Sequence, residues 1–196
     1  MLEAATALFL EKGYEGVSLS DIVERSGGSR TMLYEQFGNK EGLLKAMVER
    51  ATTRTWQAVD WDPVSSVNAE AALRDLGRRF LQAVLADDAV ATFRIIVTEA
   101  RRMPGLAAFF FEHGPKRVQA RLTAWFVAAA AAGLVRAEQP EALARVFVGG
   151  VFADLHLRRV LGLAAGYSEA EIEAHLTIAV SAFVDGVLSR PANTAA

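Results

Sequence analysis

Apolar residues recur at helical spacing along most of the chain, and no convincing run alternates apolar and polar positions as a strand would. The pattern predicts an all-α protein of about nine helices. The expected helices are residues 2–12, two short ones that begin after Ser18 and Ser29, about 40–59, one around 73–84, 89–102, 106–132 with a break at Gly114 and Pro115, 141–163 and 168–189. Residues 60–68 are expected to form a loop, with Trp61 as a lid or packed corner.

The two short helices, within residues 18–40, carry the clearest functional pattern. Ser18 is a suitable N-cap with Asp21 three residues later, which is nearly a capping box. Gly27 suits the positive φ at which a helix often stops, and Ser29 suits the cap of the next helix. Two short helices around a tight glycine turn predict a helix-turn-helix, whose second helix fits the DNA major groove.

In the second helix Met32, Leu33 and Phe37 are expected to face inward, which leaves polar residues outside. An Arg at the first turn forms paired hydrogen bonds with guanine, and helix N-termini favour phosphate oxygens. The candidate DNA-binding residues are Ser18, Ser20, Ser29, Arg30, Thr31, Tyr34, Gln36 and Lys40. The alternative is a surface helix hairpin that binds nothing.

Residues 8–49, LFLEKGYEGVSLSDIVERSGGSRTMLYEQFGNKEGLLKAMVE, resemble the TetR family of bacterial transcriptional regulators. The family's landmarks that recur here are Gly13, Tyr14, Leu33, Tyr34, Phe37, Lys40 and Glu41. Residues 94–115 resemble the AefR-like version of the C-terminal domain. The resemblance implies a dimer, a small-molecule cavity and an operator in double-stranded DNA.

Three features depart from the family pattern. Gly28 stands where the family usually has an apolar residue such as valine. Glu35 and Gln36 replace an aromatic residue and a histidine; Gln36 suits a phosphate, whereas Glu35 must point aside or accept from a base edge. Helical sequence begins at Leu2, so the family's basic arm is either absent or lies upstream of the given start.

The last two long helices are more apolar than the surface of a monomer requires. With the family resemblance they are expected to form a four-helix dimer interface, and a two-fold dimer suits a palindromic operator. The candidate interface residues are Phe147, Gly150, Val151, Leu176, Val180, Phe183 and Val187. A larger core within one chain is the alternative.

The middle helices carry many large apolar side chains with a few charged groups among them, a composition typical of ligand pockets. The resemblance implies that a small-molecule effector binds there. The candidate residues are Trp56, Phe80, Phe93, Arg94, Val97, Arg101, Phe110, His113 and Trp125. A plain aromatic core is the alternative for each of them.

Charge and composition narrow these expectations. The chain of 196 residues has a net charge of −2 and no cysteine, which is compatible with the reducing cytoplasm where we expect it. Residues 1–50 carry six basic and eight acidic side chains, so few phosphate contacts and modest non-specific affinity are expected. The most apolar run, residues 122–135, is too short to span a membrane.

Chemistry beyond binding finds little support. His113, His156 and His175 share no metal-ligand spacing, and neither a phosphate loop nor a nucleophile elbow is present. We therefore expect no enzyme activity, no cofactor and no metal.

The sequence predicts a DNA-binding domain at residues 1–45 and a ligand-binding and dimerisation domain at 46–196. We expect a homodimeric repressor that a small molecule releases from a palindromic operator. The alternatives are an activator or co-repressor-dependent regulator, a ligand-binding or interaction protein with a weakened DNA-binding head, and a small α-helical enzyme.

Overall fold

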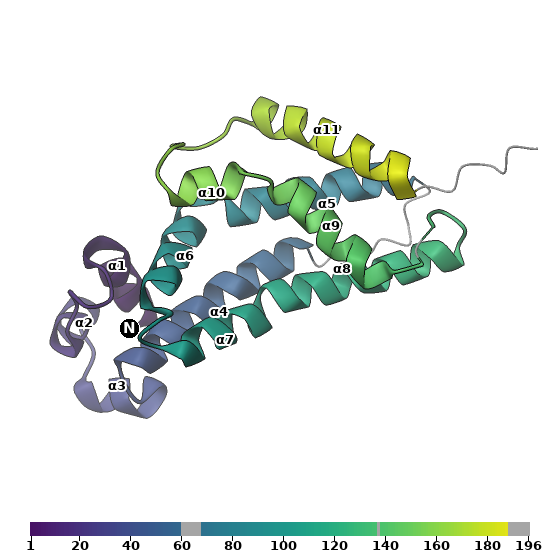
Figure 1. Cartoon of the computed structure of the whole chain (residues 1–196). Helices are drawn as coiled ribbons and strands as arrows, with labels where there is room; N and C mark the ends of the chain where they lie inside the picture. Colours follow the sequence, from purple (N-terminus) through teal and green to yellow (C-terminus); the bar gives the residue numbers. More distant parts are fainter. Residues whose placement is uncertain (60–67, 137, 188–196) are drawn as a thin grey trace, which may run out of the picture. The chain divides into compact units, whose positions relative to one another are not determined.

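The computed structural model describes residues 1–59, 68–136 and 138–187 (Figure 1). The described residues form eleven helices, and the predicted all-α class is confirmed. The helices are α1 (Leu2–Lys12), α2 (Leu19–Ser26), α3 (Arg30–Phe37), α4 (Lys40–Val59), α5 (Ala69–Val84), α6 (Asp87–Glu99), α7 (Pro104–His113), α8 (Pro115–Ala131), α9 (Pro140–Phe152), α10 (Leu155–Val160) and α11 (Glu169–Val187). They fall into two compact units, residues 1–55 with 86–115 and residues 56–85 with 116–196.

The first unit surrounds a core to which the three N-terminal helices, α4 and α6 all contribute. Phe9 of α1, Ile22 of α2 and Leu33 of α3 are fully buried there, and Ile96 of α6 joins the same cluster. Helix α1 packs on both α2 and α6, and α2 packs on α3. The short α2 and α3 are therefore held by tertiary packing, which helices of eight residues need in water.

The second unit is organised around α11, which packs against α5 and α9. Gly77 allows α5 to approach α11 closely, because a Cβ at this position would lie 2.8 Å from Cδ2 of Leu176. At the edge of this contact, Arg78 of α5 pairs with Glu173 of α11, and Nη1 of Arg74 donates to Oγ1 of Thr177 at 2.8 Å. An apolar centre with a polar margin fixes the register of the two helices.

One predicted helix is interrupted. The expected helix over 141–163 is in fact α9 and α10, separated at Ala153, where φ is +39°. Alanine at positive φ is strained, and neither proline nor glycine marks the position. The apolar pattern continues through the break, which is why the sequence did not reveal it. The break predicted at Gly114 and Pro115 is confirmed as the boundary of α7 and α8.

The expected loop over 60–68, including Trp61, lies outside the described residues except for Asn68. Oδ1 of Asn68 accepts from the backbone N–H groups of Glu70 and Ala71, and so caps α5. The predicted domain boundary near residue 45 concerns function, and the division into compact units does not test it.

Candidate nucleic-acid interface

The turn between α2 and α3 is built by caps on both helices. Oγ of Ser18 accepts from the backbone N–H of Asp21 at 3.2 Å, and the Asp21 carboxylate accepts from the backbone N–H of Ser18 at 2.7 Å. The backbone N–H of Ser18, and after it the Ser18 hydroxyl, donate to the Asp21 carboxylate and so lower the pKa of Asp21. Gly27 ends α2 in the left-handed region at φ 66°, and Oγ of Ser29 caps α3 by accepting from Met32 N–H at 3.1 Å. The helix pair predicted from the sequence is present.

Arg30 is oriented by a hydrogen bond to the neighbouring helix α2. Its Nη2 donates to Oγ of Ser20 at 2.6 Å, so a side chain of α2 orients the guanidinium at the first turn of α3. Thr31, Tyr34 and Gln36 are exposed on the same helix, Tyr34 at 54%. The structure therefore leaves an Arg, hydroxyl groups and an amide exposed on this short helix, and such groups hydrogen-bond bases and phosphates.

The other candidate DNA-binding residues have structural partners. Ser18 and Ser29 use their hydroxyl groups in the two caps, although both residues are exposed. Lys40 lies at the start of α4, where its Nζ is 4.3 Å from the centroid of the Tyr14 ring. A cation over an aromatic face keeps its charge while losing freedom, so Lys40 presents a fixed positive charge.

One residue of α3 does not face inward as expected. Met32 is 45% exposed, whereas Leu33 is fully buried and Phe37 is half-buried. Consecutive helical residues are about 100° apart, so Met32 lies beside the buried stripe and not within it. Met32 and Glu35 thus join the exposed surface of α3.

Several basic groups of the N-terminal helices are engaged within the first unit. Arg25 forms a two-pronged ion pair with Glu11, at 2.6 and 2.8 Å, and the pKa of Glu11 is lowered chiefly by the hydrogen bond from Arg25. Lys45 pairs with Glu41 at 2.8 Å. These pairs neutralise positive charge that phosphates would otherwise attract.

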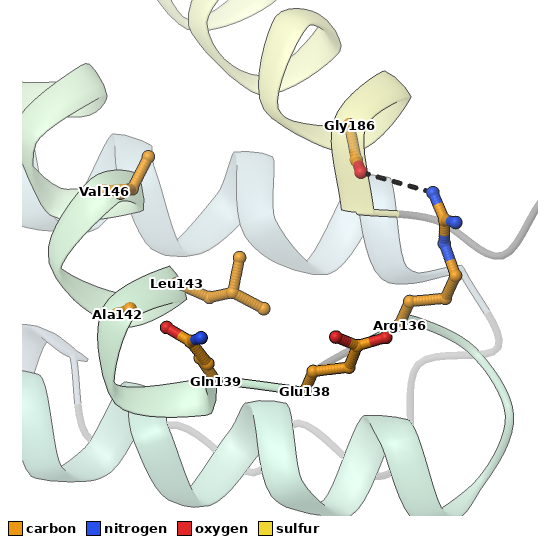
Figure 2. A pocket seen from close by; sticks show the side chains of 7 residues that line it. All are labelled: Arg136, Glu138, Gln139, Ala142, Leu143, Val146 and Gly186. Carbon is orange, nitrogen blue, oxygen red and sulfur yellow. Dashed lines mark hydrogen bonds between the residues drawn. The ribbon is translucent and has the colours of Figure 1, made fainter.

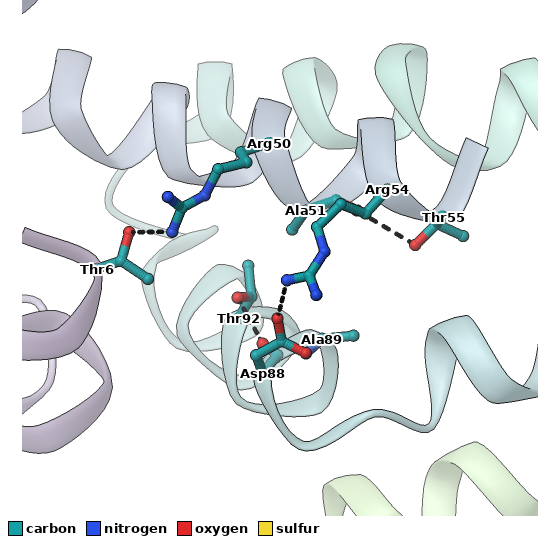
Figure 3. A network of polar contacts seen from close by, with 8 residues as sticks. All are labelled: Thr6, Arg50, Ala51, Arg54, Thr55, Asp88, Ala89 and Thr92. Atoms are coloured by element: carbon teal, nitrogen blue, oxygen red, sulfur yellow. Dashed lines mark hydrogen bonds and ion pairs between the residues drawn. The ribbon is translucent and has the colours of Figure 1, made fainter. Parts of the chain in front are cut away.

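Two arginines one turn apart on α4 link it to other helices of the first unit (Figure 3). Nη2 of Arg50 donates to Oγ1 of Thr6 in α1 at 3.1 Å. Arg54 pairs with the carboxylate of Asp88 at the start of α6. Figure 3 shows both side chains reaching from α4 to these neighbours, so α4 holds α1 and α6 through polar contacts as well as through the core.

The candidate ligand-binding residues fall in both compact units. In the first unit the ring centroids of Phe93 and Phe110 lie 5.7 Å apart. The His113 ring stacks on that of Phe109, and its Nδ1 lies 2.8 Å from the Phe109 carbonyl oxygen. Arg94, Val97 and Arg101 of that unit are exposed. In the second unit Phe80 and Trp125 are buried in the core and Trp56 packs against it. A shared pocket for these residues stays a prediction.

A surface pocket of about 330 Å³ lies in the second unit beside α9 and the end of α11 (Figure 2). It is lined by Arg136, Glu138, Gln139, Ala142, Leu143, Val146 and Gly186. Arg136 donates to the Gly186 carbonyl across it at 3.5 Å. None of the candidate ligand-binding residues lines this pocket.

The candidate dimer-interface residues divide between the interior and the surface. Phe147, Val151, Leu176 and Val180 are buried in the core of the second unit, and Phe183 is half-buried. Side chains buried in one chain cannot contact a second chain, so these four are corrected to core residues. Gly150 is exposed, and nothing lies within 4 Å of a Cβ placed there. The position of the Val187 side chain lies outside the description.

The exposed apolar residues of α9 and α11 are different ones. Val146 is 62% exposed and Ile178 is 72% exposed. They line a hollow with Gly150, His175, Ala179, Ala182 and Phe183. We call this surface the α9–α11 face. The helical period predicted two apolar helices, but the choice between core and surface required the packing of α5 beneath them.

The glycine turn, the capped helix pair and the exposed second helix define a helix-turn-helix protein. Residues 1–47 match the family model for bacterial regulatory proteins of the tetR family, and residues 71–186 match that for the C-terminal domain of AefR-like transcriptional repressors. The chain therefore belongs to the TetR family of regulators, and the resemblance predicted from the sequence is confirmed.

Solved structures of relatives cover nearly the whole chain. The Flavonoid-responsive Regulator FrrA is 32% identical, with a TM-score of 0.81 over 97% of this chain and 96% of that one. A TetR-family regulator from Mesorhizobium loti MAFF303099 is 26% identical, with a TM-score of 0.86 over 96% and 95%. The described residues thus have the fold of the family.

Among curated proteins, the HTH-type transcriptional repressor ComR of Escherichia coli (strain K12) is 45% identical over 53 residues. That match covers 27% of this chain and 25% of ComR. Across the first curated relatives the chain spans about a quarter to a third of their length. Among the described residues, none of the helices has the length and apolar character to cross a membrane.

Proposed function

We propose that the chain is a transcriptional repressor that binds a palindromic operator as a homodimer. Residues 1–45 form its DNA-binding part and residues 46–196 its ligand-binding and dimerisation part. One observation carries the proposal: the exposed surface of α3, on which Ser20 orients Arg30. In helix-turn-helix proteins bound to DNA, groups at the first turn of the recognition helix contact base edges in the major groove.

The remaining DNA contacts follow from where the other side chains lie. Thr31 and Tyr34 are exposed beside Arg30, and Gln36 is exposed toward the end of α3. Lys40 adds a fixed positive charge at the start of α4. The N–H groups of the first turns of α2 and α3 suit phosphate oxygens, while the hydroxyl groups of Ser18 and Ser29 maintain the caps.

A second copy of the chain is the proposed occupant of the α9–α11 face. Val146 and Ile178 would be costly to leave in water, and Gly150 permits a helix to approach closely. A two-fold interface of this kind presents two copies of α3 to two half-sites one turn of DNA apart.

A small-molecule effector is proposed to release the operator, and the name of FrrA makes flavonoids the first probes. An effector acts only through different affinities for the DNA-bound and free states. The contacts of Arg50 and Arg54 offer a route by which α6 and α1 move with α4. We propose no enzymatic step.

Selection from random double-stranded DNA with the purified full chain tests the proposal. We expect an inverted repeat to be enriched, and a flavonoid panel added to the complex to identify a compound that releases it. A chain that enriches no sequence would instead support an interaction protein with a weakened DNA-binding head, which the excess of acid over base in residues 1–50 favours as the second candidate.

A further inference from the structure

The residue of α3 that faces most directly outward is Glu35. With about 100° between consecutive residues, Glu35 lies about 160° around the helix from both the buried Leu33 and the half-buried Phe37. Thr31, one turn earlier, lies on the same outward line. Any surface that the exposed side of α3 approaches therefore meets Glu35 near its centre.

Glu35 has no partner for its charge, unlike three other acidic groups of the N-terminal helices and α4. Glu11 is paired with Arg25, Asp21 accepts from the cap at Ser18, and Glu41 is paired with Lys45. The Glu35 side chain is exposed and forms no hydrogen bond or ion pair with the described residues. Its carboxylate is thus available as an acceptor on the recognition surface.

A carboxylate on that surface cannot contact phosphate oxygens, which it repels, and which are acceptors as well. In the major groove the cytosine N4 amino group is a donor that Glu accepts from. We propose that Glu35 accepts a hydrogen bond from cytosine N4 and so selects a C·G pair at one position of each half-site. This inference rests on the proposed DNA-binding function and names a base that the site reads.

The test is selection and affinity measurement with the wild type, Glu35→Gln and Glu35→Ala. Gln pairs with adenine through its amide, so Glu35→Gln should change the preferred base at one position of each half-site from C to A. Glu35→Ala should flatten the preference there. On an operator altered in one half-site, we expect the wild type to lose about 5- to 150-fold in affinity and Glu35→Ala to lose little.

The matched control is Glu49→Gln, which removes the same charge from an exposed position of α4. Both Gln variants should bind all DNA somewhat more tightly because a negative charge is lost. An unchanged base preference in Glu35→Gln, with only that uniform gain, would overturn the inference and leave the proposed function intact. A wild type that selects no sequence would overturn both.

Discussion

At the scale of single residues, Arg30 carries the largest share of the proposed base recognition. Its guanidinium is oriented by Ser20 at 2.6 Å, so little freedom is lost when it meets a base. Arg30→Ala should weaken binding of a selected operator by about 1–3 kcal/mol per half-site and relax the preference at one base pair. Titration of operator variants measures both effects.

Arg25→Ala is the control for this substitution. The Arg25 guanidinium already donates two hydrogen bonds to the Glu11 carboxylate, so Arg25→Ala should leave the base preference unchanged. If Arg30→Ala had the same small effect, α3 would not lie in the groove as proposed.

A second residue-scale prediction concerns His156, which is buried in α10 with its ring 4.7 Å from that of Phe152. Burial lowers the pKa of His156 below its ordinary value of 6.5. Below that value the unfolded chain binds a proton that the folded chain does not, so the free energy of unfolding falls as the pH falls toward the folded-state pKa. Well above pH 6.5 the histidine is neutral in both the folded and the unfolded chain, so this loss of stability is absent.

Urea unfolding at pH 7.5 and pH 5.5 measures this dependence. His156→Gln should reduce the loss of stability at the lower pH. An equal pH dependence in the wild type and His156→Gln would show that another group is responsible.

The sequence predicted these residues unequally well. Arg30 and Tyr34 could be predicted as exposed because caps and a helical period fix where they point. The dimer candidates Val180 and Leu176 could not be told from surface residues, because α11 is apolar on several sides and only the packing of α5 decides which side is interior.

At the scale of elements, the α2–α3 turn depends on Gly27. Its φ of 66° lies in the left-handed region, and nothing lies within 4 Å of a Cβ built there. Gly27→Ala should therefore destabilise the first unit by about 1–2 kcal/mol through backbone strain alone. Thermal or urea unfolding measures the loss.

Gly105→Ala is a matched control, since that Cβ would also meet open space but without a positive φ. Its stability should be unchanged or slightly higher, because alanine favours the helix. Equal stability of the two variants would contradict the account of the turn.

Element boundaries show where sequence patterns reach their limit. Proline and glycine marked the end of α7, and serine marked the start of α3, because each has a local conformational preference. Ala153 carries no such signal, and the break between α9 and α10, at a positive φ, runs against the helix preference of alanine.

At the scale of the whole molecule, the proposed dimer requires the α9–α11 face. Ile178→Glu places a charge on a residue that is 72% exposed, so the variant should fold normally but become monomeric and lose operator binding. Val180→Glu should instead prevent folding, because that side chain is fully buried. Sedimentation and circular dichroism separate the two outcomes.

Val127→Glu, on the exposed side of α8, serves as the control and should stay dimeric. A dimer that persists in Ile178→Glu would show that the subunits meet elsewhere.

The charge distribution of the whole chain limits how DNA is bound. Arg25 and Lys45 are engaged in ion pairs, which leaves Lys12, Arg30 and Lys40 as the principal cations of the first three helices and the start of α4. Each phosphate that a protein neutralises adds about −0.9 to the slope of log K against log salt concentration. For a dimer this slope should therefore be no steeper than about −5. Contacts with specific bases must then supply much of the binding free energy.

The most direct test is therefore the affinity of the full chain for its selected inverted repeat and for a scrambled duplex of the same composition, measured across salt concentrations. The proposed function predicts one dimer per repeat, binding to the repeat at least about 10³-fold tighter than to the scrambled duplex, and a shallow salt slope for both. Equal affinity for the two duplexes, or a slope much steeper than about −5, would contradict it.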